Sequence, residues 1–119
     1  MSHSSRFLAR VLMRGSTALA AYAAAELLKS RPTAHAGWSS DPLSGWQDWL
    51  RQRLNELAVA VAFGDCAIFT RQVQWATALL TARGFALDDI RSSVEHLGDV
   101  LRRELPETIG PLAVEHLER

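Results

Sequence analysis

The sequence predicts an all-α protein, an antiparallel bundle of four main helices with a short C-terminal helix. Three observations predict this fold. Ala and Leu dominate the apolar residues, which make up 48% of the chain, and β-branched residues are sparse, which favours helix over strand. Apolar side chains recur every three or four residues, and glycines divide these stretches into segments of helical length. The 119 residues suffice for one core, so we expect one domain, residues 1–119.

The segment from Arg6 to Lys29 has apolar side chains at helical spacing and predicts the first helix. Gly15 and Ser16 in its middle predict a bend or a frayed first half. The stretch SRPTAHAGWSSDPLSG that follows has no periodicity, and it predicts a long loop.

Charge is distributed unevenly along the chain. Residues 1–37 carry five basic side chains and one acidic one, a net charge of +4, namely Arg6, Arg10, Arg14, Lys29 and Arg31 against Glu26. Because the whole chain has a formal net charge of zero, the remainder carries −4. This asymmetry favours docking of a basic N-terminal helix on an acidic bundle, in the same chain or in a partner chain.

The helical bundle itself is predicted to span residues 42–117. An apolar stripe from Trp46 to Val61 predicts the second helix, which begins near Pro42. Its polar face carries Asp48, Arg51, Gln52, Asn55 and Glu56.

Gly64 and Asp65 mark the end of the second helix and the start of the third. Glycine tolerates the left-handed conformation just past a helix end, and aspartate is a favoured N-cap. The third helix then follows the stripe from Ile68 to Leu80. Cys66 lies in its first turn, and because no His or Lys stands near it in the sequence, we interpret it as a packed free cysteine.

Arg83 and Gly84 repeat the stop signal before a fourth helix from Leu87 to Leu105, and Pro111 introduces a short fifth one. The apolar stripes of these helices predict the core, which comprises Trp46, Trp49, Leu50, Leu57, Val61, Phe69, Val73, Leu80, Ile90, Val94, Leu97 and Leu101.

Several classes of function lack support in the sequence. The zero net charge argues against binding to nucleic acid or to an anionic membrane. No stretch approaches the ~20 apolar residues of a membrane-spanning helix, so we expect a cytoplasmic protein. The single cysteine and the absence of CxxC and HExxH motifs argue against a structural zinc site. No P-loop, GxGxxG or GxSxG motif occurs, so we assign no catalytic residue and expect a non-enzymatic protein.

Tryptophans and one histidine are the candidate binding residues. The four tryptophans, Trp38, Trp46, Trp49 and Trp75, are many for this length. They fit either core packing or the wall of a pocket for a planar cofactor. His96 lies at the edge of the fourth apolar stripe, where it is either a ligand for a haem or corrinoid metal or a half-solvated boundary residue.

The segment LAVAVAFGDCAIFTRQVQWATALLTARGF and the stripe that continues to Leu105 resemble the helical bundles that precede cobalamin-binding domains in bacterial B12-dependent regulators. The resemblance covers residues 46–117. Those light-responsive regulators carry a tryptophan, nine residues and then Glu-His. Glu115 and His116 are similar to that pair, with Leu105 in the tryptophan position. The resemblance implies that Trp75, His96, Glu115 and His116 lie near a cobalamin, whose other face a domain outside this chain would hold.

The order of helices is also similar to globin-like N-terminal domains of bacterial signalling proteins, which work as dimeric input modules. Together these resemblances imply a non-enzymatic sensory or regulatory module that acts through helix packing and protein–protein association. The cobalamin cap is the alternative. A homodimer is expected to use the apolar surface of the first helix, with Leu12, Leu19 and Tyr22.

Overall fold

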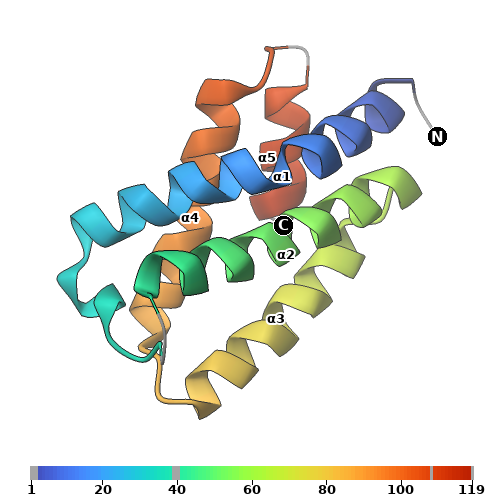
Figure 1. The fold of residues 1–119 in the computed structure, drawn as a ribbon. Helices are drawn as coiled ribbons and strands as arrows, with labels where there is room; N and C mark the ends of the chain where they lie inside the picture. Colours follow the sequence, from blue (N-terminus) through green and yellow to red (C-terminus); the bar gives the residue numbers. More distant parts are fainter. Residues whose placement is uncertain (1–2, 39–40, 108, 119) are drawn as a thin grey trace.

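The computed structural model describes residues 3–38, 41–107 and 109–118, without the side chains of residues 3, 4, 112, 116 and 118. Every regular element in these residues is helical (Figure 1). The elements are α1 (His3–Ser30), a 3₁₀ turn η1 (Pro32–His35), α2 (Pro42–Phe63), α3 (Cys66–Ala82), α4 (Leu87–Glu104) and α5 (Gly110–Glu118). The predicted all-α class, with four main helices and a short fifth, is confirmed.

The first helix differs from the prediction at Gly15. α1 continues through Gly15 and Ser16, and Leu8 and Leu12 in its first half are fully buried, so this half is not frayed. The Ser16 hydroxyl donates to the carbonyl of Met13 at 3.1 Å. Burial against α2 along the length of α1 outweighs the low helix propensity of one glycine.

The predicted boundary between α2 and α3 is confirmed. Gly64 ends α2 in the left-handed conformation, with φ at 67°. The carboxylate of Asp65 accepts a hydrogen bond from the amide of Ala67 at 3.0 Å and so caps α3. Cys66 opens this helix and is half-buried.

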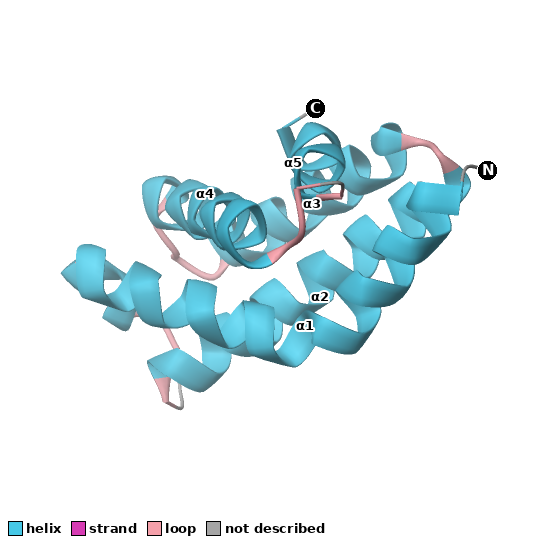
Figure 2. Cartoon of the chain, turned by 90° about the horizontal axis from the view of Figure 1, so that it is seen from above, coloured by secondary structure: helices cyan, strands magenta, loops and turns pink. Residues whose placement is uncertain are grey.

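Figure 1 shows α2 running back antiparallel to α1, and α3 running back from the end of α2. In Figure 2, α1 and α2 lie side by side, and α4 and α5 pack on one face of this helix pair. The predicted core lies between these layers and is buried, except that Val73 and Val94 are only half-buried at its edge.

The apolar surface expected to form a dimer is not available on α1. Leu12 is fully buried and Leu19 is 6% exposed within the single chain, because both side chains face the core. Of the three residues expected at the dimer surface, only Tyr22 is exposed.

Ion pairs near both ends of α4 hold it against the N-terminal segment. Arg103 donates to both carboxylate oxygens of Glu26 in α1, at 3.0 and 3.2 Å. This hydrogen bonding lowers the pKa of Glu26 below its ordinary value. Asp89, with a side chain 5% exposed, accepts from Arg31 at 2.6 Å and from Thr33 at 2.8 Å, which fixes η1 against the start of α4.

Across the residues that the structure describes, no helix combines the length and the apolar character needed to cross a membrane.

Candidate functional site

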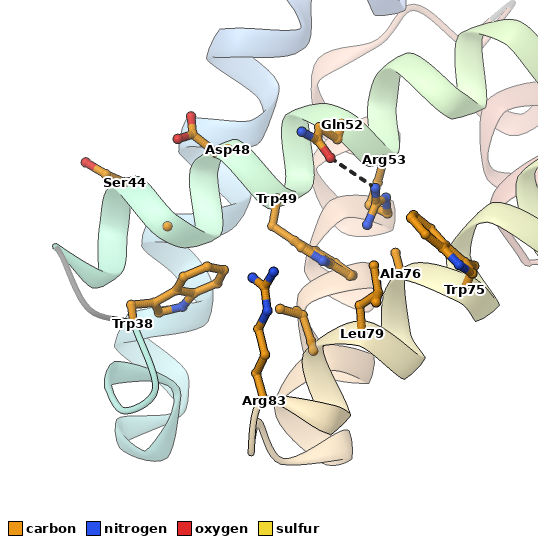
Figure 3. A pocket seen from close by; sticks show the side chains of 12 residues that line it. Trp38, Ser44, Asp48, Trp49, Gln52, Arg53, Trp75, Ala76, Leu79 and Arg83 are labelled. Atoms are coloured by element: carbon orange, nitrogen blue, oxygen red, sulfur yellow. Dashed lines mark hydrogen bonds between the residues drawn. The ribbon is translucent and has the colours of Figure 1, made fainter.

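An open groove of about 500 Å³ lies between α2 and α3 (Figure 3). Because the two helices are antiparallel, the first half of α2 faces the second half of α3. Trp75, Leu79 and Arg83 recur at intervals of four residues and line it from the α3 side. Trp49 and Arg53 line it from α2.

Arg53 is a buried cation at the floor of the groove, 3% exposed. Its guanidinium carbon lies 4.6 Å from the centre of the Trp49 ring, a stacking distance that suits a guanidinium on an indole. Its Nε and Nη2 donate to the two carboxylate oxygens of Glu56 at 2.7 and 2.9 Å. The Glu56 carboxylate therefore compensates the charge of Arg53.

One nitrogen of this guanidinium is left without a partner. Nη1 of Arg53 is buried and has no hydrogen-bond acceptor in the described part of the chain. Nη2 makes a second contact, to the Gln52 side chain, at the long distance of 3.5 Å. A buried donor without an acceptor costs roughly 1–3 kcal/mol, so this arrangement needs an explanation.

Aromatic side chains form the end of the groove nearest η1. Trp38 packs against Trp46 and Phe85, with ring centroids 5.4 and 4.7 Å away. Its ring lies directly on the backbone of Gly45, where an added Cβ would be 2.6 Å from Trp38 Cε3. Trp38 Nε1 is a second buried donor with no partner in the described residues.

Arg83 supplies a charge to the groove that no carboxylate compensates. Its side chain is exposed and makes no ion pair with any residue described. Figure 3 shows it extending from the end of α3 toward the space between Trp38 and Trp49. Asp48, the carboxylate at the rim, lies 3.6 Å from Arg51.

The structure places the predicted cofactor-binding residues in separate locations. Trp75 is 64% exposed and lines the α2–α3 groove. His96 is half-buried, and its Nε2 lies 2.9 Å from the Ser30 hydroxyl at the end of α1. Glu115 lines a different hollow, of about 690 Å³, between α4 and α5, together with Leu105. His116 lies in α5, and its side chain is outside the described residues.

The tryptophans divide between the two roles that the sequence left open. Trp46 is fully buried, and its indole Nε1 donates to the Ala34 carbonyl at 2.7 Å. Trp49 is mostly buried but also lines the groove, whereas Trp75 exposes most of its surface there. Trp46 therefore serves only core packing, whereas Trp49 and Trp75 also form walls of the groove.

Arg53 and Arg83 were not among the predicted site residues. The signal for Arg53 is present in the sequence, because it stands four residues after Trp49 and four before Leu57, on the apolar stripe of α2. Glu56, three residues further on, is the partner that such a buried arginine needs. Arg83 carries no comparable signal, since a basic residue at a helix end is common.

Comparison with known proteins gives no relative, because no family model, curated protein or solved structure matches this chain. Among the described residues, no group of three or more His, Cys, Asp or Glu side chains could hold a metal ion. The groove itself offers aromatic surfaces, the two arginines Arg53 and Arg83, and the carboxylate of Asp48 at its rim.

Proposed function

We propose that this chain is a non-enzymatic sensory or regulatory module whose effector binds in the groove between α2 and α3. The observation that carries the proposal is that Nη1 of Arg53 is a buried donor without an acceptor in the described part of the chain. Arg53 is 3% exposed and lies at the floor of an open groove that Trp49 and Trp75 also line. Buried donors normally have acceptors, and a concave site with a few unmet polar groups is the usual form of a ligand pocket.

The way α3 packs on the other helices allows it to respond to a ligand bound in the groove. Its buried side chains are Phe69, Ala76 and Leu80, while Trp75 and Leu79 are exposed on the groove side. α3 packs mainly on α2 and makes smaller contacts with α4 and α5. Elements with few buried apolar contacts open at low free energy, so a ligand between α2 and α3 would change the position or the mobility of α3.

Signalling by this module would then run through association with other proteins or with a second copy of the chain. The regulatory role, the homodimer and a cytoplasmic location belong to the same proposal. Because Leu12 and Leu19 are buried, a dimer would use another surface. The outer face of α3 is the candidate, since ligand binding in the groove would move this helix.

The proposal is tested by filling the groove covalently, which requires no knowledge of the ligand. In a Cys66→Ser background, Leu79→Cys is labelled with a naphthyl maleimide, and Phe63→Cys serves as the matched control. Phe63 is 75% exposed on α2 and does not line the groove. Amide hydrogen exchange along α3 and sedimentation velocity are measured for both labelled proteins.

We expect the label at position 79 to change exchange along α3 and to shift the association state, and the label at position 63 to change neither. If both labelled proteins exchange and sediment alike, groove occupancy is not transmitted and the regulatory proposal is wrong.

A further inference from the structure

We propose that the α2–α3 groove binds an aromatic carboxylate, a planar apolar ring system that carries one carboxylate group. This inference rests on the proposed function, and it adds the chemical class of the effector.

The walls of the groove select a flat apolar body. Trp49 and Trp75 present indole surfaces from opposite helices, and Leu79 lies between Trp75 and Arg83 on the α3 side. Rigid rings gain contact area on such surfaces with little loss of conformational entropy. The volume of about 500 Å³ lies in the range of sites for small molecules.

Two described residues that line the groove carry a buried polar atom without a partner, and both atoms are donors. They are Nη1 of Arg53 and Nε1 of Trp38. Glu56 occupies the Nε–Nη2 side of the guanidinium, which leaves the end formed by Nη1 and Nη2 with only the 3.5 Å contact to Gln52. A guanidinium end of this kind matches the two oxygens of a carboxylate.

The charge balance of the groove favours one negative charge. Glu56 compensates Arg53, and Asp48 at the rim lies beside Arg51. Arg83 alone remains uncompensated among the described charges at the groove. A monoanion would neutralise Arg83, whereas a cation would be repelled by it and could not accept from Arg53.

Access to Nη1 of Arg53 requires the side chains that cover it to move, and we assign this movement to Trp75. Nη1 is shielded from solvent, and Figure 3 shows Trp75 on α3 at the same end of the groove as the Arg53 guanidinium on α2. Trp75 is 64% exposed and has few neighbours to hold it. Its indole would turn outward and then close on the ring of the ligand.

The test compares a carboxylate with its neutral isostere by isothermal titration calorimetry. The compounds are 2-naphthoate and 2-naphthamide, titrated into the full chain near pH 7. The variants are Arg83→Gln and, as the matched control, Arg71→Gln. Arg71 is an exposed arginine of the same helix that does not line the groove, so both substitutions remove the same charge.

We expect naphthoate to bind about tenfold or more tightly than naphthamide, because a charged acceptor strengthens these hydrogen bonds. Arg83→Gln should weaken naphthoate binding about fivefold, with little effect from Arg71→Gln. Circular dichroism checks that both variants fold alike.

Three results would overturn the inference, and each leaves the proposed function separately testable by the naphthyl label. The first is equal binding of the acid and the amide, which would make the groove a site for neutral apolar ligands or for an apolar side chain of a protein. The second is the absence of naphthoate binding at millimolar concentration. The third is equal weakening of naphthoate binding by the two arginine substitutions.

Discussion

Arg53 and Glu56 form a bidentate ion pair, in which the arginine is 3% and the glutamate 21% exposed, and the Arg53 guanidinium stacks on Trp49. The pair places a buried charged group at the floor of the α2–α3 groove. Its energetics can be tested apart from any ligand.

Removing Glu56 should cost more stability than removing Arg53. Glu56→Ala leaves a buried guanidinium without its carboxylate, and we expect a loss of about 2–3 kcal/mol. Arg53→Met replaces the charge with an apolar chain of similar volume, and we expect a loss of about 1 kcal/mol or less. Urea unfolding at pH 7 measures both values. A larger loss for Arg53→Met would mean that the pair itself stabilises the fold.

Asp89 should contribute far more to the folding stability of the protein than its neighbour Asp88. Asp89 accepts from Arg31 and Thr33 while buried, so Asp89→Asn should cost about 2–3 kcal/mol. Asp88 is exposed in the same first turn of α4, and Asp88→Asn should cost about 0.5 kcal/mol through the helix dipole. Thermal unfolding of the two variants compares them. Similar losses would show that the dipole, and not the contact with η1, accounts for the effect.

The Glu26–Arg103 contact should make stability depend on acidic pH. Hydrogen bonding to Arg103 lowers the pKa of Glu26 in the folded state. The contribution is therefore complete above the ordinary glutamate pKa of about 4.3 and is lost as the pH falls through the lower folded value. The contact is partly exposed, so it is small, at most about 1 kcal/mol.

Urea unfolding of the wild type and Glu26→Gln at pH 7 and pH 3 separates this contribution from the rest of the acid response. The difference in unfolding free energy between the two proteins should shrink at pH 3. A difference that is the same at both pH values would assign the effect of the variant to packing alone.

Gly45 should be required for the shape of the groove. An added Cβ would lie 2.6 Å from Trp38 Cε3, so Gly45→Ala must displace the Trp38 ring from its contacts with Trp46 and Phe85. We expect a loss of about 1–3 kcal/mol and a changed tryptophan emission spectrum. Gly15→Ala is the control, since its Cβ would meet only Leu19, at 3.4 Å. An unchanged emission spectrum of Gly45→Ala would show that Trp38 does not depend on this glycine.

The sequence predicted the helices well because their signals are local. Spacing of apolar residues defined α2 and α4, and Gly64 with Asp65 defined the turn between α2 and α3 through backbone conformation and capping. The continuity of α1 through Gly15 was not predictable in this way, since it depends on packing against α2, a helix that lies further along the chain.

Only some of the residues that form the groove could be predicted from the sequence. Trp75 was recognised as a candidate, but its exposure depends on how α3 is rotated against α2. The position of Arg53 on the apolar stripe was readable, whereas its missing acceptor emerges only from the three-dimensional packing. His96 was proposed from its place at the edge of the fourth apolar stripe and Glu115 from a resemblance, and the fold places both outside this groove. Their role toward cobalamin stays a prediction.

The most direct test of ligand binding in the groove uses the four indole N–H signals in a two-dimensional ¹⁵N NMR spectrum, assigned by single Trp→Phe variants and followed during titration with 2-naphthoate. We expect saturable shifts of the Trp49 and Trp75 signals, a smaller shift of Trp38, and the smallest for Trp46, whose indole N–H donates to the Ala34 carbonyl in the core. Unmoved signals, or a shift of Trp46 as large as that of Trp75, would contradict ligand binding in the groove.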